Sequence, residues 1–312
     1  MEIITLREYL SGPARQYDPL NDYLFYKVMG EKGSELQLLG FLNAVLGKTG
    51  NDRFTSVMIL ENKTFMPETI GDKSCILDVR ALLQSKTMVN VEVQLRNQHN
   101  MDRRSLFYWS REYSKSLSAG MNYRELPDVI SINIVNFDYP PIRKFHTCYH
   151  LREDQHHDHI LTNALEIHYL NMVQYRKQGR VKLHEPLNRW LAWLDKGSPP
   201  GLIAEVTKMD EAIQTANERM AYITQDEEVA RAYWRRQMAL ADHIGEVEFA
   251  RDEGKEIGLE KGREIGCADA RTSIARNLLE EGSSPEFIQK VTGLDAKTIQ
   301  GLSADTAPGQ CP

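Results

Sequence analysis

The sequence predicts an α/β fold with an all-helical C-terminal extension, and three observations support this prediction. A helical stretch near the N-terminus is followed by three strand-like runs, a helix and another strand. In that order, the last strand has to reach the sheet through a helical crossover. Past about residue 185 the spacing of the apolar residues is helical throughout. The chain of 312 residues is long enough for one large domain or two modest ones.

Two helices are predicted between Asn21 and Leu46, where apolar residues recur at helical spacing. Gly30 and Gly33 divide this stretch, and Asn21 supplies a start signal. The next elements are three runs rich in Val, Ile and Leu, at about 54–61, 74–83 and 88–95. Only a short polar break separates the last two runs, which predicts an antiparallel hairpin.

The second half of the α/β part begins with a helix that fits residues 102–118. Three further strands are predicted at 128–137, 144–151 and 164–170. The helical region then starts with predicted helices at 187–194, 202–220 and 227–249.

A biased tract follows, with a glycine at every fourth position from Gly254 to Gly266. It is interpreted as a helical linker of low complexity, or alternatively as a surface for helix self-association. Short helices are predicted at 271–281 and 285–292, the second capped by Ser284 with Pro285 in its first turn, and another starts near residue 294. The predicted domains are an arm (1–16), the α/β core (17–175), a helical extension (176–250), the Gly-repeat helical linker (251–267) and a small helical module (268–305).

The composition gives no globally basic surface. The chain has 38 Lys+Arg against 44 Asp+Glu, a formal charge of −6, so any nucleic-acid binding rests on a local patch. No run approaches the roughly 18 apolar residues of a membrane span, and the N-terminus lacks the order of a signal peptide. The four cysteines form no CxxC pairs. These features predict a cytoplasmic protein without membrane association.

The predicted hairpin carries the most informative side chains, Asp78, Glu92 and Gln94. Alternation along the second strand places Glu92 and Gln94 on one side of the sheet. Asp78 interrupts an apolar stretch, where an unpaired carboxylate is costly. Two carboxylates from neighbouring strands repel each other unless a cation lies between them, and Mg²⁺ with oxygen ligands meets this need. Asp78 and Glu92 are therefore the predicted metal ligands, with the carbonyl of Val93 as a third.

The chemistry predicted for this site is phosphodiester hydrolysis, in which a metal neutralises charge and activates water. Gln94 would lie beside the attacking water, which it can orient but not deprotonate. The structural alternative is a hairpin whose acids pair with arginines, and the candidates are Arg80, Arg103 and Arg104.

The predicted helix at 102–118 interleaves basic and aromatic residues. Arg104, Tyr108 and Arg111 share one face and could contact DNA phosphates or bases. The alternative is a core helix with a solvated cationic edge.

Histidines and a cysteine gather near the end of the α/β part, where His146, Cys148 and His150 alternate on one predicted strand and His156, His157 and His159 follow. Such ligands suit Zn²⁺. The spacing matches no familiar zinc module, and neighbouring acidic residues favour a surface loop.

Several motifs together resemble the recombination-promoting nucleases, also described as transposases, of the PD-(D/E)XK nuclease superfamily. The resemblance covers roughly residues 17–300. It rests on the blocks Asn21–Lys27, Phe41–Leu46, Asp72–Val79, Val91–Gln94, Arg103–Tyr113, Gly120–Tyr123, Val129–Phe137 and Leu165–His168, on the Gly-rich tract and on the terminal helices.

The resemblance implies a restriction-endonuclease-like core, a mixed sheet flanked by helices. It further implies a Mg²⁺-dependent DNA endonuclease, with Mn²⁺ as a substitute, that works in recombination or transposition. Asp78, Glu92 and Gln94 would form the active site. Such enzymes generally cut both strands, so a homodimer is expected.

Two residues depart from the family pattern: Gln94 stands where the superfamily usually has lysine, and Leu77 where proline precedes the first acid. Lys27, Lys73 or Arg111 could supply the missing charge. Asp22, preferred over Glu35, could be an accessory acid, and it could equally be a helix N-cap.

Two other functions stay open. The chain could be a DNA-binding or assembly protein that keeps the nuclease fold and has lost catalysis, which Gln94 favours. Alternatively, the C-terminal half with its glycine repeat could be the working part, as a multimerisation arm.

Overall fold

The computed structural model describes residues 16–60, 79–84, 86–117, 120–179 and 181–305. Asp78, Leu77, Lys73, the first part of the predicted strand at 74–83 and nearly all of the predicted arm lie outside these residues. The chain divides into two compact units, Met1–Ala239 and Leu240–Pro312.

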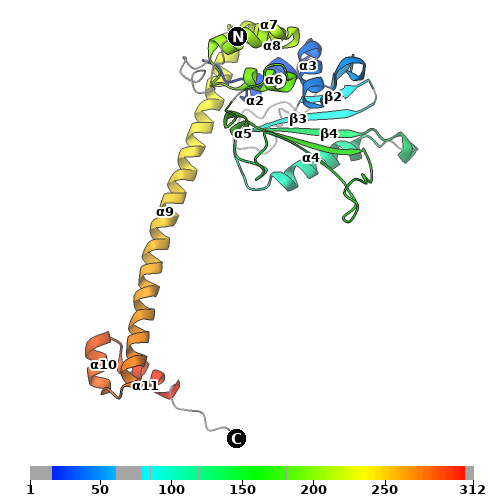
Figure 1. Ribbon diagram of the computed structural model, residues 1–312. Helices are drawn as coiled ribbons and strands as arrows, with labels where there is room; N and C mark the ends of the chain where they lie inside the picture. The colour runs from blue at the N-terminus through cyan, green and yellow to red at the C-terminus, as the bar shows by residue number, and fades with distance from the viewer. Residues whose placement is uncertain (1–15, 61–78, 85, 118–119, 180, 306–312) are drawn as a thin grey trace. The chain divides into compact units, whose positions relative to one another are not determined.

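The first unit is built on a mixed six-stranded sheet with the order β1-β2-β3-β4-β6-β5 (Figure 1). β2 is antiparallel to both of its neighbours, β1 and β3, whereas β3, β4 and β6 run parallel, and β5 is antiparallel to β6. The strands are β1 (Val57–Leu60), β2 (Val79–Leu83), β3 (Met88–Gln94), β4 (Val129–Val135), β5 (His146–His150) and β6 (Leu165–Asn171).

The hairpin and the crossover predicted from the sequence are both present. β2 pairs with β3 in antiparallel register, Val79 opposite Val91. Helix α4 (Met101–Lys115) connects β3 to the parallel strand β4 and packs against β4. The Trp109 indole fastens α4 to the sheet by donating to the carbonyl oxygens of Val129 at 2.9 Å and Ala164 at 3.3 Å.

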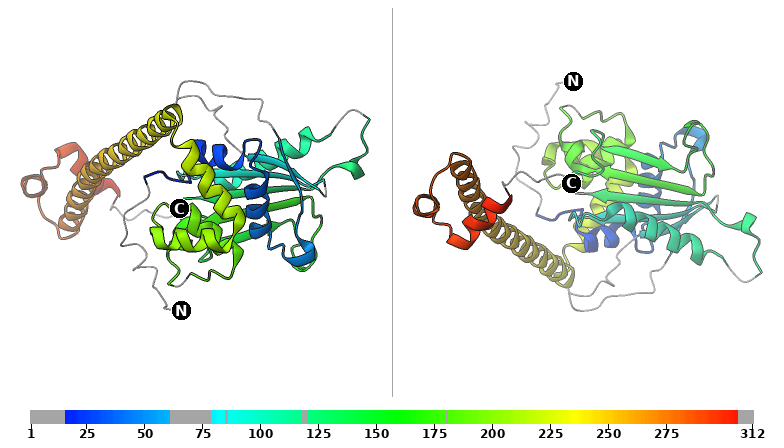
Figure 2. Two further views of the ribbon diagram at one scale, coloured as in Figure 1. Left: turned by 90° about the horizontal axis from the view of Figure 1, so that it is seen from above. Right: turned by 90° about the horizontal axis from the view of Figure 1, so that it is seen from below.

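The opposite face of the sheet is covered by a group of helices that share one hydrophobic core with it (Figures 1 and 2). The helices of this unit that contribute to that face are α2 (Asp22–Met29), α3 (Glu35–Val45), α5 (Met172–Arg176), α6 (Pro186–Leu194), α7 (Pro200–Met209), α8 (Glu211–Ile223) and the first part of α9 (Glu227–Glu280). Phe41 and Trp190 meet edge to face, 5.6 Å between ring centroids. Gly40 lets α3 approach α8 closely, since a Cβ there would lie 2.4 Å from the Cβ of Ala212.

One predicted helix is wrong: the stretch 202–220 forms two helices, α7 and α8, which separate at Asp210. The Asp210 backbone is extended, with φ −146° and ψ 111°. Its side chain accepts a hydrogen bond from the N–H of Ala212 and pairs with Arg189 at 3.0 Å. An aspartate bonded in this way caps a new helix and competes with continuation of the old one. The short helix α5 was also not predicted.

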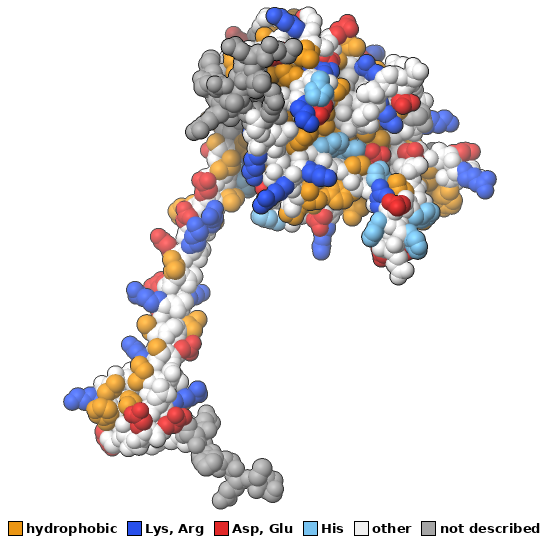
Figure 3. Space-filling view, viewed as in Figure 1, with side chains coloured by type: hydrophobic (Ala, Val, Ile, Leu, Met, Phe, Trp, Pro, Cys, Tyr) orange, Lys and Arg blue, Asp and Glu red, His pale blue; other side chains and the backbone are white. Residues whose placement is uncertain are grey.

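Helix α9 (Glu227–Glu280) is continuous, whereas the sequence predicted separate helices at 227–249 and 271–281 joined by a linker. The predicted linker is thus helical, but it does not interrupt the helix. Side chains of both charges follow one another along α9 (Figure 3). None of the described helices is long and apolar enough to cross a membrane.

The second unit has a small core of its own, formed by the end of α9 with α10 (Pro285–Thr292) and α11 (Ala296–Asp305). Ser284 caps α10 as predicted, accepting from the N–H of Phe287, and Gly293 ends the helix with φ +70°. A left-handed glycine at this place is the usual stop of a helix.

Candidate functional site

Glu92 lies on β3, in the middle of the sheet, and points toward α4. It pairs in parallel register with Asn133 of β4, and the hydroxyl of Ser105 on α4 donates to the Asn133 side chain at 3.2 Å. Val91 and Val93 point to the other face, as the predicted alternation requires. The Glu92 residue is 3% exposed, so its carboxylate depends on partners inside the protein.

The two oxygens of the Glu92 carboxylate have very different surroundings. Oε1 accepts from the Arg104 guanidinium, at 2.9 Å from Nε and 2.5 Å from Nη2. It also accepts from Nε2 of Gln94 at 2.5 Å. Oε2 is buried and has no hydrogen-bond partner among the described residues. One oxygen is therefore held by three donors, while the other has none among the described residues.

Burial raises the pKa of Glu92 above its ordinary range, although the Arg104 charge and the hydrogen bonds from Arg104 and Gln94 act to lower it. A raised carboxyl pKa means that the ionised form is less favourable in the folded protein than in water. A cation on Oε2 would supply the missing stabilisation. Arg104 and Gln94 therefore offset only part of the cost of burying the ionised Glu92.

The first predicted metal ligand, Asp78, lies outside the described residues. Val79 pairs with Val91 in the antiparallel register of β2 and β3. In the sequence, Asp78 is the residue before Val79, and Glu92 is the residue after Val91.

On α4, Arg104, Tyr108 and Arg111 lie together. Both guanidinium groups are over the Tyr108 ring, 5.0 Å from its centroid for Arg104 and 5.6 Å for Arg111. Nε of Arg111 is buried without a hydrogen-bond partner among the described residues. The shared face predicted for these residues is confirmed. The structural alternative expected an ion pair between an acid of the hairpin and one of three arginines, and Arg104 forms such a pair with Glu92. Arg80 pairs instead with Glu112 of α4.

The two predicted accessory residues have other partners. Asp22 binds Arg236 of α9 at 2.5 Å, and Lys27 binds Glu31 at 2.5 Å. The prediction of Asp22 as an N-cap is wrong, because Asn21 caps α2 by accepting from the N–H of Leu24. Asp22 occupies the first helical position instead, where its charge still favours the helix dipole.

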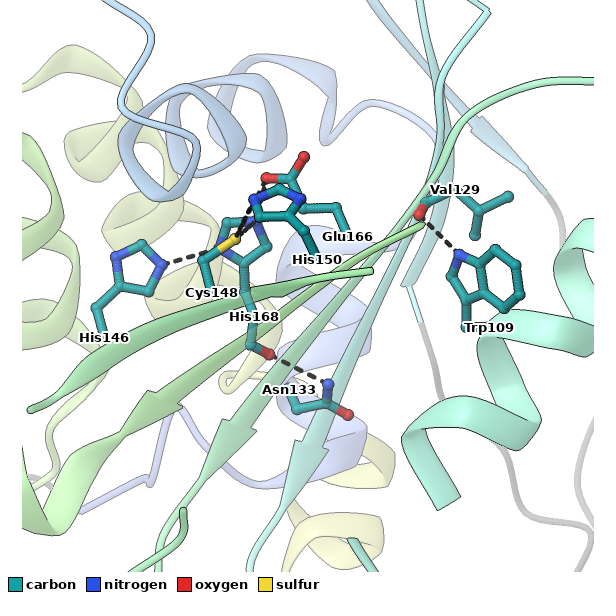
Figure 4. A network of polar contacts seen from close by, with 8 residues as sticks. All are labelled: Trp109, Val129, Asn133, His146, Cys148, His150, Glu166 and His168. Atoms are coloured by element: carbon teal, nitrogen blue, oxygen red, sulfur yellow. Dashed lines mark hydrogen bonds and ion pairs between the residues drawn. The ribbon is translucent and has the colours of Figure 1, made fainter. Parts of the chain in front are cut away.

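A second polar cluster lies on the other face of the sheet, on β5 and β6 (Figure 4). It contains His146, Cys148 and His150, which the sequence singled out, and also Glu166 and His168, which the sequence analysis did not connect with them. The loop residues His156, His157 and His159 are exposed. Burial and the Glu166 charge raise the pKa of the Cys148 thiol to about 12.

An acid-bearing hairpin joined by a helical crossover to parallel strands, with helices on both faces, defines an α/β core of the nuclease type. A family model described as PD-(D/E)XK nuclease family transposase matches residues 19–250, and the chain belongs to this family. The predicted family and the predicted restriction-endonuclease-like fold are thereby confirmed. Neither the curated proteins nor the solved structures gave a match. Membership indicates a nuclease-like function with DNA as the substrate, and nucleases of this type use divalent metals.

Proposed function

We propose that this protein is a Mg²⁺-dependent DNA endonuclease that hydrolyses phosphodiester bonds in recombination or transposition, with Mn²⁺ as a substitute metal. The observation that carries the proposal is the buried Oε2 of Glu92, which has no donor among the described residues while Oε1 has three. A carboxylate oxygen of this kind is a suitable ligand for a hard cation.

Asp78 and Glu92 are the proposed metal ligands. The support for Asp78 is its place in the sequence next to Val79, whose register partner Val91 is the neighbour of Glu92. When bound, the ion would neutralise the charge that develops on the phosphate and activate the attacking water.

Gln94 is the proposed water-positioning residue. Its Nε2 already donates to Glu92, so the side chain is fixed beside the metal ligand. An amide cannot accept a proton at neutral pH, and the chemistry therefore needs a base other than Gln94.

Arg104 is proposed as a positioning residue for Glu92, since its guanidinium holds Oε1 and leaves Oε2 for the metal. Arg111 and Tyr108 are the proposed contacts for the DNA backbone. Nε of Arg111 has no hydrogen-bond partner among the described residues, and both guanidinium groups lie over the Tyr108 ring. We further propose that the enzyme is cytoplasmic and acts as a homodimer, with accessory roles for Asp22 and Lys27.

The test is plasmid nicking by the full chain at increasing Mg²⁺, for wild type, Asp78→Ala and Glu92→Gln. Metal catalysis contributes several kcal/mol, so each variant should lose more than about 100-fold in rate. Asp52→Ala is the matched control, because it removes an exposed acid of the short helix η1 (Gly50–Asp52). Equal nicking by all four proteins would contradict the proposal.

The second candidate is a DNA-binding or assembly protein that has lost catalysis. Two observations favour it: Gln94 replaces the usual lysine, and Arg104 already neutralises Glu92. Such a protein would shift DNA in a gel without cutting it at any Mg²⁺ or Mn²⁺ concentration, and Asp78→Ala would leave the shift unchanged.

A further inference from the structure

The edge strand β5 and its neighbour β6 place a set of soft and borderline metal ligands on one face of the sheet. Cys148 pairs with His168 and His150 with Glu166 in the antiparallel register. Because side chains alternate along a strand, these four residues point to the same side. Their positions are fixed by backbone pairing, so their meeting does not depend on a loop.

This face is not the face of the nuclease site. Glu92 pairs with Asn133, Asn133 with Tyr169 and Tyr169 with Thr147, so these four side chains share the α4 face of the sheet. Cys148 and His168 are each one residue away from this row and point to the opposite side. The second cluster therefore needs a function of its own.

The ligand atoms lie close together (Figure 4). Sγ of Cys148 is 3.6 Å from Nε2 of His168, 3.7 Å from Oε1 of Glu166 and 3.3 Å from Nε2 of His150. Nε2 of His168 is 2.6 Å from Oε1 of Glu166. One ligand atom each of Cys148, Glu166 and His168 fall within 4.8 Å of one another.

These separations match the edges of a tetrahedral zinc site. Bonds of about 2.3 Å to sulfur and about 2.0–2.1 Å to nitrogen or oxygen give edges of about 3.3–3.6 Å between ligands. The three distances from Cys148 are already of this size. The His168–Glu166 distance is shorter because the two groups share a hydrogen bond, and it has to widen by less than about 1 Å when a metal replaces the proton.

We propose that Cys148, Glu166 and His168 bind a Zn²⁺ ion, and that His150, which lies outside this group of three but has its Nε2 3.3 Å from Sγ of Cys148, turns in as the fourth ligand. A thiolate together with imidazole selects a borderline metal over Mg²⁺, which prefers oxygen. With four protein ligands the site is closed, which is the arrangement of a structural zinc. The ion would fasten the edge strand β5 to β6.

His146 contacts the ring of His168 and would fix its orientation in the site. Its Nε2 lies 2.9 Å from Nδ1 of His168, and the two rings stack with centroids 5.2 Å apart and 22° between their planes. A histidine that binds metal through Nε2 normally donates its Nδ1 proton to a neighbour, which fixes the ring. His168 is 3% exposed, so its ring orientation depends on such neighbours.

The experiment uses the full chain, stripped with EDTA, and adds Co²⁺ alone or Zn²⁺ alone. The Co²⁺ bound at this site should give thiolate-to-cobalt charge-transfer absorption with intense visible bands typical of tetrahedral sites. Zn²⁺ should abolish this spectrum and raise the melting temperature, whereas a large excess of Mg²⁺ should leave the spectrum unchanged.

Cys148→Ser is the decisive variant, and Cys267→Ser, which changes an exposed cysteine of α9, is its control. The first should lose the thiolate absorption, and the second should keep it. His146→Gln should weaken Zn²⁺ about tenfold or more with the absorption retained, as the loss of a supporting group does. The absence of any cobalt spectrum, or a spectrum that Cys148→Ser leaves intact, would overturn the site. An unchanged Zn²⁺ affinity in His150→Gln would overturn the fourth ligand.

Discussion

The Glu92 carboxylate is costly to bury, and it is also a proposed metal ligand. Its burial raises its pKa, and only one of its oxygens has donors among the described residues. Groups of this kind often lower stability in exchange for activity. The same electrostatics lead to a pH dependence that does not need an activity assay.

We expect the stability of Glu92→Gln relative to wild type to rise from acidic to neutral pH in the absence of metal. The folded protein holds the Glu92 proton more tightly than the unfolded chain, so wild type loses stability as pH rises from the unfolded pKa, near 4.5, through the raised folded pKa. The amide has no such dependence. The difference in melting temperature between variant and wild type should therefore grow from acidic to neutral pH, with about 2–4 °C for each kcal/mol.

The measurement is thermal unfolding from pH 4 to 8 in EDTA, with the exposed Glu125→Gln as control. A constant difference across this range would show that burial does not disfavour the ionised Glu92. Added Mg²⁺ should reduce the advantage of the variant, because only wild type keeps the proposed ligand.

Local sequence signals predicted most boundaries of the helices and strands. The remaining features depend on contacts between residues that are far apart in the sequence. Gly30 and Gly33 separate α2 from α3, and Ser284 caps α10, as expected. The break at Asp210 was missed because its stabilising partner, Arg189, lies 21 positions away in the sequence. The pairing of Cys148 with His168 was missed for the same reason, since it requires the register of β5 against β6.

The close contact of α3 with α8 predicts that a Gly→Ala substitution changes the stability of the protein differently at Gly40 and at Gly201. Gly40→Ala should destabilise the protein by about 1–3 kcal/mol, because the added Cβ would overlap Ala212 and force the helices apart. Gly201 lies in the helix α7, where an added Cβ would meet no described atom within 4 Å apart from its chain neighbours and the backbone of its own helix. Gly201→Ala should therefore be neutral or stabilising by up to about 1 kcal/mol. Urea unfolding of both variants is the measurement. Equal effects at the two positions would contradict close packing at Gly40.

For the whole molecule, the two units have separate cores. The core of the first unit draws on buried residues from Leu20 to Tyr233, and that of the second on Ala275, Ile288, Ile299 and Leu302. The α/β core and its hairpin could be predicted because hydrophobic periodicity is local. The extent of α9 could not, since glycines at every fourth position argue for an interrupted helix.

A chain that ends at residue 250 keeps the whole family match and the carbonyl of Ala239, to which Arg96 donates at 3.2 Å. We expect its melting temperature to stay within about 2–3 °C of the full chain, because the first core loses no member. Calorimetry checks this expectation, and a large drop would contradict independent cores.

Sedimentation of the same shortened protein tests the multimerisation arm. If residues 251–312 drive assembly, the full chain should sediment as an oligomer and the shortened chain as a monomer. An unchanged state of assembly would exclude the arm and leave any dimer to the α/β unit.

Trp109 has a consequence for the alignment of the strands. Its single N–H reaches the carbonyls of Val129, at the start of β4, and Ala164, just before β6, and so holds both strand ends level. A slip of β6 by one residue would exchange the two sides of that strand, turning Ile167 toward the helical layer opposite α4 and His168 toward α4. The hydrogen bonds of the indole on the α4 side of the sheet therefore help to keep the histidine side chains on the opposite side.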